Sequence, residues 1–243
     1  MQATFAVMTH HDREAVGNVF NPALMRHARA KSWAALNAIS ERMHPGIRED
    51  EAIAMAGEVF RDLGMQRLWH PPYIRIGPNT LKTYRERSIP DVQLGENDIY
   101  FIDLGLVFEG HEGDVGDTFV VGDAPKYAAC AHAARDLYRD VAAKWRNEGL
   151  SGHNLYNYAD ERAEAMGWRF NHAIKGHRIS DFPHSVHKGG DLGDLEHSPS
   201  SDLWVLEIQI AHPNEPFGAF YEDLLTGAAP VGARQLSETP DTH

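Results

Sequence analysis

Apolar residues recur at helical spacing in two segments near the start of the chain. The first covers about 21–43, where Asn21 can cap a helix and Pro22 suits its first turn. The second covers about 49–63 and is followed by Gly64, a common residue just past the end of a helix. Both segments have one apolar and one polar face, so they predict two amphipathic helices.

Shorter apolar runs follow the two helices and predict strands. We expect them at 73–76, 99–108 and 118–121, separated by stretches rich in turn residues. The second run is almost continuously apolar, which is typical of a strand that is covered on both faces. The exception inside it is Asp103, whose carboxylate therefore needs an explanation.

The same order of elements then returns. Helical patterns and later strand-like runs occupy 126–147, 154–166, 168–174, 203–210 and 219–225. Two helices followed by strands, given twice, predict two similar halves that face each other.

The bulk composition is that of an ordinary globular protein. With 243 residues, of which 42% are hydrophobic, the chain can bury a sizeable core. We expect one folded domain over residues 21–230, after an N-terminal extension (1–20) and before a polar C-terminal tail (231–243). The stretch 189–202 is a long loop, and such loops often border a site.

Charge, cysteine content and run length exclude several classes of function. A net charge of −12 argues against nucleic acid, whose phosphates repel such a chain. No apolar stretch is long enough to cross a bilayer, and the N-terminus shows no secretory signal. The single cysteine, Cys130, excludes an intramolecular disulfide. We therefore expect a cytoplasmic protein that binds neither nucleic acid nor a membrane.

Four acidic side chains lie inside otherwise apolar runs or close to one. Burying an ionised carboxylate such as that of Asp103 is costly unless a cation or strong donors compensate. Asp114 follows past a turn at 109–110, so two adjoining strands can bring both carboxylates together. Glu207 and Glu222 repeat the pattern in the two apolar runs near the C-terminus.

Acids embedded in several apolar strands repel one another unless cations lie between them. Carboxylates suit hard divalent metals, and an imidazole among the ligands widens the choice to manganese, iron, cobalt or zinc. Each acid taken alone is equally compatible with a salt-bridged or capping role near a strand end. Together, the four favour a metal site.

Motifs around these acids are similar to those of a known family. They are Ile102-Asp103-Leu104-Gly105, Gly113-Asp114, Gly176-His177, Leu206-Glu207-Ile208 and Tyr221-Glu222-Asp223. In their order and spacing they resemble the metal-binding segments of the pita-bread metallopeptidases, which include the methionine aminopeptidases, Xaa-Pro aminopeptidases, prolidases and creatinases. The resemblance runs over about 28–225 and favours a compact form without the creatinase-type N-terminal domain.

The resemblance implies a fold and a metal centre. The fold is α+β, with two pseudo-symmetric halves whose helices pack on a curved, mostly antiparallel sheet. Two divalent ions would be held by Asp103, Asp114, His177, Glu207 and Glu222. In the family, the first aspartate holds one ion, the histidine and first glutamate hold the other, and the remaining two acids bridge both. The ions activate a water molecule, and Glu207 would be the proton shuttle.

The sequence departs from the family pattern on the substrate side. Members usually carry another histidine after the landmark that residues 77–80 match, whereas this chain has Tyr84 and Arg85 there and no histidine. His184 matches a family histidine that contacts the substrate at the reacting centre, and His187 is a second candidate for that role. These four side chains are the expected substrate-binding residues, and His184 is also an expected catalytic residue beside Glu207.

Two chemistries remain open on this metal site. The leading hypothesis is an aminopeptidase that cleaves the N-terminal residue of small peptides through a metal-bridging hydroxide. The alternative is a hydrolase or lyase that acts on a small-molecule amide, because the departures from the pattern lie around the substrate. A non-catalytic binding protein is less favoured, since all five metal positions are filled. A homodimer is compatible with each hypothesis.

Overall fold

The computed structural model describes residues 13–181 and 190–227 of the chain. Its helices are α2 (Pro22–Ser40), α3 (Glu49–Asp62), α4 (Pro125–Glu148) and α5 (Gly152–Ala165). Its strands are β1 (Arg67–Leu68), β2 (Tyr73–Ile76), β3 (Asp98–Phe108), β4 (His111–Val121), β5 (Arg169–Phe170), β6 (His177–Arg178), β7 (Trp204–Ala211) and β8 (Gly218–Leu224). Short 3-10 turns lie at Gly77–Leu81 and Leu192–Asp194.

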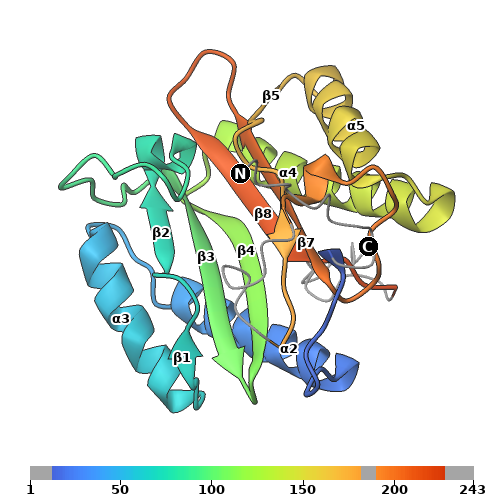
Figure 1. Ribbon diagram of the computed structural model, residues 1–243. Helices are drawn as coiled ribbons and strands as arrows, with labels where there is room; N and C mark the ends of the chain where they lie inside the picture. The colour runs from blue at the N-terminus through green and yellow to red at the C-terminus, as the bar shows by residue number, and fades with distance from the viewer. Residues whose placement is uncertain (1–12, 182–189, 228–243) are drawn as a thin grey trace, which may run out of the picture.

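The strands form one sheet in which the paired neighbours run antiparallel. Its order is β1-β3-β4-β8-β7-β5, with β2 also paired to β3 and β6 also paired to β7. Two long hairpins, β3–β4 and β7–β8, therefore lie side by side at the centre of the molecule (Figure 1). The expected α+β class with an antiparallel sheet is what the chain adopts.

The two halves of the chain have the same construction. A helix pair (α2 and α3, then α4 and α5) precedes two short strands and a long hairpin in each half. The short strands of each half pair with the first strand of the hairpin, and the halves meet where β4 pairs with β8. The repeated order of elements in the sequence thus corresponds to a real structural repeat.

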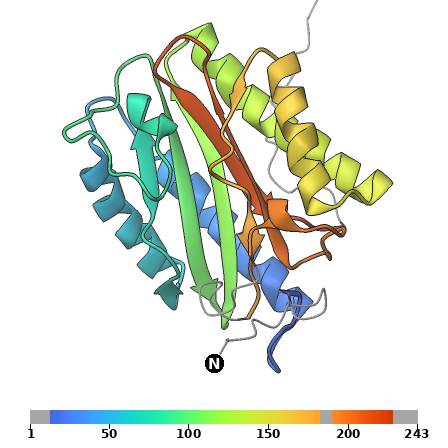
Figure 2. The ribbon, with the colours of Figure 1, turned by 45° about the horizontal axis from the view of Figure 1, so that its top comes forward.

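The helices cover one face of the sheet. In Figures 1 and 2, α2 passes behind the β3–β4 hairpin, and α4 lies behind β7 and β8. Alternate residues of the long strands point to this face and join one core with the helices, among them Ile102, Leu104, Leu106, Leu206 and Ile208. Cys130 is buried in α4 and packs in this core. No helix in the described ranges is both long and apolar enough to span a bilayer.

Close packing of α2 on β4 depends on a glycine. A Cβ at Gly113 would lie 2.5 Å from the carbonyl oxygen of Ala28 on α2, a distance that no side chain tolerates. The hydroxyl of Ser32 donates a hydrogen bond of 2.9 Å to the Gly113 carbonyl at the same contact. The helix begins where expected, since the Asn21 side chain accepts from the Ala23 amide.

The main differences from the sequence expectations concern strands. β4 begins at His111 rather than near residue 118, so Asp114 lies within the strand and not in a segment that leads into it. The run at 168–174 forms only the two-residue strand β5, and the two-residue strands β1 and β6 were not expected. The helices and the other strands agree with the expected ranges to within three residues at each end.

Candidate metal centre

The four expected acids gather on the face of the sheet opposite the helices. Asp103 on β3 is paired with Gly116 on β4, which is paired in turn with Glu222 on β8. Glu222 is also paired with Glu207 on β7. Directly paired residues present their side chains to the same face, so these three carboxylates form a row across the sheet. Asp114 lies two positions before Gly116 and shares that face, because alternate residues of a strand do.

The expected histidine reaches the same place from β6. His177 is paired with Val205, which lies two positions before Glu207 on β7 and points to the same face. The preceding residue, Gly176, has a φ of +65°, and a Cβ there would lie 2.4 Å from the Val205 carbonyl oxygen. Only glycine suits this position, and its amide donates 2.8 Å to Oε2 of Glu207. The Gly-His motif thus orients one acid as well as the imidazole.

These side chains line one pocket of about 350 Å³. The expected site residues found in its wall are Asp103, Asp114, His177, Glu207, Glu222, Tyr84 and Arg85. Tyr84 is 52% exposed, and its hydroxyl accepts a hydrogen bond of 2.9 Å from the guanidinium of Arg85. His184 and His187 lie outside the described residues. The expected site residues within the described ranges are therefore brought together.

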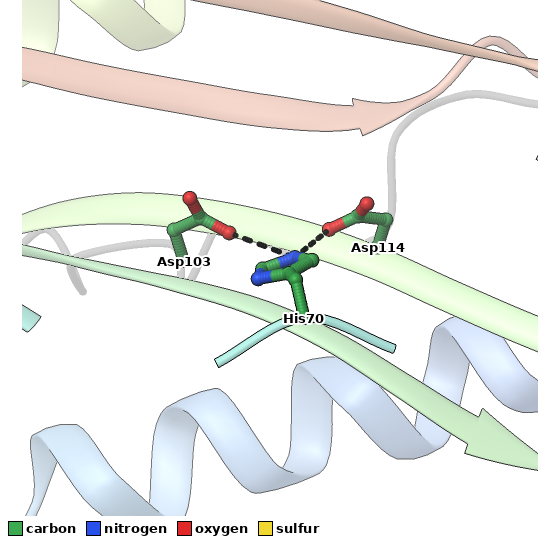
Figure 3. A group of neighbouring side chains, drawn as sticks. All are labelled: His70, Asp103 and Asp114. Carbon is green, nitrogen blue, oxygen red and sulfur yellow. Dashed lines mark hydrogen bonds and ion pairs between the residues drawn. The ribbon is translucent and has the colours of Figure 1, made fainter. Parts of the chain in front are cut away.

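One histidine of the pocket was not predicted as a site residue from the sequence. His70 lies between β1 and β2, and its Nε2 is 3.4 Å from Oδ1 of Asp103 and 3.4 Å from Oδ1 of Asp114 (Figure 3). The chain lacks the family histidine near Tyr84, but it places this imidazole in the pocket from an earlier position. The sequence carried only a weak signal, a histidine next to two prolines just before a strand.

Burial raises the pKa of most acids in the pocket, so they ionise less readily in the absence of a cation. It raises the pKa of Asp103 to about 6 and that of Glu207 to about 7. It also raises the pKa of Glu222 well above its ordinary value, and the neighbouring carboxylates raise it further. Asp114 is the exception, because His70 and His177 outweigh its burial and hold its pKa well below the usual range.

For the two histidines of the pocket, the effect of neighbouring charges on the pKa is larger than the effect of burial. Burial alone would lower the pKa of each imidazole, but the facing carboxylates raise the pKa of both His70 and His177 to about 10. For His177 the main partner is Asp114, at 3.2 Å from Nε2 to Oδ2. The pocket thus concentrates negative charge that positive charge must balance.

The donor atoms meet the requirements of divalent metals. Two groups have ligand atoms within 4.8 Å of one another: His70, Asp103 and Asp114 form one, and Asp114, His177 and Glu222 form the other. Glu222 is only 1% exposed, and its Oε1 has no hydrogen-bonding partner among the described residues. A buried carboxylate oxygen without a donor is costly unless a cation binds it. Carboxylate oxygens with imidazole nitrogens are the ligands of manganese, cobalt, iron and zinc.

Asp114 belongs to both groups. Its Oδ1 faces His70 and its Oδ2 faces His177, so the two oxygens point toward different clusters. Asp114 could therefore donate one carboxylate oxygen to each group.

The chain is similar to known proteins in sequence and in fold. A family model described as metallopeptidase family M24 matches residues 23–226. A search of curated proteins gave no match.

Solved structures with the same fold are numerous. The X-Pro aminopeptidase from Thermotoga maritima aligns with a TM-score of 0.71 at 18% identity, covering 86% of this chain and 61% of that chain. The prolidase from Pyrococcus furiosus aligns with a TM-score of 0.70 at 21% identity, covering 84% of this chain and 60% of that chain. The methionine aminopeptidase from Thermotoga maritima aligns with a TM-score of 0.66 at 14% identity, covering 86% of this chain and 95% of that chain. The chain thus spans about three fifths of the first two proteins, and the expected pita-bread fold is confirmed.

Proposed function

The chain belongs to metallopeptidase family M24, and we propose that it is a dinuclear metal-dependent aminopeptidase acting on short peptides. The observation that carries this proposal is the position of Asp114, whose two carboxylate oxygens face two separate clusters of donor atoms. A single-ion site would need only one of these clusters. The family match favours a peptidase over the alternative of a small-molecule hydrolase or lyase.

The proposed ligands are Asp103, Asp114, His177, Glu207 and Glu222. When bound, two divalent cations such as manganese or cobalt activate the attacking water and polarise the scissile carbonyl. The protein contributes a fixed arrangement of donors, because four of the five side chains come from central strands of one sheet. Their positions are thereby set before any substrate binds.

Glu207 is the proposed proton shuttle. Its Oε2 accepts from the Gly176 amide, which fixes the carboxylate beside the other acids. Burial raises the pKa of Glu207 to about 7 in the absence of a cation, and cations bound beside it would favour the ionised form. An ionised carboxylate in this position can accept a proton from the nucleophile and pass it to the leaving amine.

The substrate proposal follows from the size and rim of the pocket. A volume of about 350 Å³ is at the small end of ligand pockets and suits a few residues of peptide. The Tyr84 ring provides an exposed apolar surface, and the adjacent Arg85 suits a peptide carboxylate. Relatives named as aminopeptidases and prolidases support peptides as the substrate class. The cytoplasm remains the proposed location.

The proposal is tested with Mn²⁺-loaded protein and a library of short peptides, each supplied with a free and with an acetylated N-terminus. We expect release of the N-terminal residue from the free peptides only. The variant Asp114→Ala should bind less metal and cleave at the rate of the metal-free protein. Asp123→Ala, at an exposed position just after β4, is the matched control and should behave as wild type. A metal-loaded protein that leaves every peptide intact would overturn the aminopeptidase assignment.

A further inference from the structure

The pocket holds two histidines that are arranged alike around Asp114. His70 Nε2 lies 3.4 Å from Oδ1 of Asp114, and His177 Nε2 lies 3.2 Å from Oδ2. In both residues, Nδ1 faces the carbonyl oxygen of the next residue along the chain, Pro71 at 2.8 Å and Arg178 at 3.4 Å. The same local contact therefore aims both rings into the cluster of acids.

The contact with Pro71 determines what His70 offers to the pocket. A carbonyl oxygen only accepts hydrogen bonds, so Nδ1 of His70 carries a proton. In the neutral ring, Nε2 then has a lone pair, which points at the carboxylates of Asp103 and Asp114 (Figure 3). A lone pair facing two carboxylate oxygens is repelled unless a proton or a metal cation lies between them, and a divalent cation in that place would be bound by all three groups at once. A backbone carbonyl on the far nitrogen is also the usual partner of a metal-binding histidine.

The structure makes room for the His70 ring. A Cβ at Gly105 would lie 2.5 Å from Nε2 and 2.4 Å from Cδ2 of His70, so only glycine leaves space for the imidazole over β3. The Trp69 amide donates 2.8 Å to the Gly105 carbonyl, which ties the loop to the strand. On the other side, the Tyr73 ring is stacked on His70 with centroids 5.6 Å apart. The imidazole therefore packs against both β3 and the Tyr73 ring.

The separations between donor atoms match a shared ion. Two ligand atoms that each lie about 2.1 Å from one cation at a near-tetrahedral angle are about 3.4 Å apart. His70 Nε2 has this separation from both Asp103 and Asp114. One nitrogen of the ring is therefore close to a carboxylate oxygen of both acids at the same time, as a shared ion requires.

We infer that His70 is a second imidazole ligand of the metal centre, completing with Asp103 and Asp114 the site of one ion. Each half of the molecule then supplies two carboxylates and one imidazole: His70, Asp103 and Asp114 from the first, and His177, Glu207 and Glu222 from the second. This inference rests on the proposed metal centre, and it adds a sixth ligand from a position that the sequence motifs do not include.

Metal binding by His70→Ala tests the inference. After loading with Mn²⁺ and dialysis, we expect wild type to retain two ions. The variant should retain one, or bind one of the two at least about 10-fold more weakly in a calorimetric titration. His172→Ala removes an imidazole that is 66% exposed and should match wild type. If the alanine variant does not fold, the same measurement is made on His70→Gln, which keeps a polar group of similar length.

A spectroscopic readout separates a ligand from a residue that contacts substrate. In the Co²⁺-loaded protein, each imidazole bound to the ion contributes one strongly shifted ring N–H proton signal in the NMR spectrum. We expect two such signals in wild type and one in His70→Ala. Two ions bound with unchanged affinity and both signals retained would overturn the inference and leave the proposed function standing. Absence of bound metal in wild type would instead overturn the proposed function.

Discussion

At the scale of single residues, the site depends on which face of the sheet each side chain occupies. Asp103, Glu207 and Glu222 share a face because they are paired in register through Gly116. Gly116 itself leaves space at the centre of this row, since a Cβ there would lie 3.0 Å from Cγ of Glu222 and 2.6 Å from the Phe220 ring. A shift of one residue in register would turn each acid toward the helices.

Replacement of Glu207 by glutamine should impair turnover more than folding. An amide cannot accept the proton that a carboxylate accepts, although its oxygen can still accept from the Gly176 amide. We expect kcat for peptide cleavage to fall about 10²–10⁴-fold, the usual contribution of a positioned acid–base group. Steady-state kinetics on the metal-saturated variant measures this.

The matched control is Glu215→Gln, in the turn between β7 and β8. Glu215 is paired with Lys126 at the surface, so kcat should be unchanged. A fully active Glu207→Gln protein would contradict the role assigned to Glu207.

The acids of the site were predictable from the sequence, and His70 was not. Asp103 and Glu207 each interrupt an apolar strand, where a charged group is costly and therefore conspicuous. His70 lies in a loop, where a polar residue is ordinary, and it is one of 15 histidines. Its position depends on the Trp69–Gly105 hydrogen bond, a contact between segments far apart in the chain.

At the scale of elements, the helices and long strands were predictable because their apolar periodicity is strong. The start of β4 was not, since residues 110–116 contain three glycines and two acids, which are poor strand formers. Gly113 is required by the approach of α2, and Asp114 belongs to the site. Strands of two residues, such as β1 and β6, are too short to produce a periodic pattern.

A buried ion pair joins α2 to β8 behind the site. Arg29 makes two hydrogen bonds to the carboxylate of Asp223, and both side chains are almost fully buried. We predict that Arg29→Met destabilises the protein by about 3–5 kcal/mol, because it leaves the Asp223 charge without a partner. Adding Asp223→Asn should recover most of this loss. Urea unfolding of the single and double variants measures both effects.

The control is the exposed pair of Arg139 and Asp136, with nitrogen and oxygen 2.8 Å apart. Arg139→Met should cost at most about 1 kcal/mol, as is usual for surface pairs. If Arg29→Met cost no more than this control, the claim that the buried pair stabilises the fold would be wrong.

At the scale of the whole molecule, the proposed metal centre lies where two equivalent halves meet. β4 of the first half pairs with β8 of the second, and each half brings two acids and one histidine to the shared face. The repeated helix and strand pattern predicted these halves. The convergence of their side chains on one pocket depends on pairing between strands more than 100 residues apart, which periodicity does not encode.

Diffraction from crystals grown with Mn²⁺, recorded with the anomalous signal of manganese, tests the dinuclear centre most directly. We predict two peaks in the pocket, about 3.5–4 Å apart, with Asp114 between them and one carboxylate oxygen directed at each. A single peak at saturating Mn²⁺, or no peak beside Asp114, would contradict the two-ion centre from which the proposed activity follows.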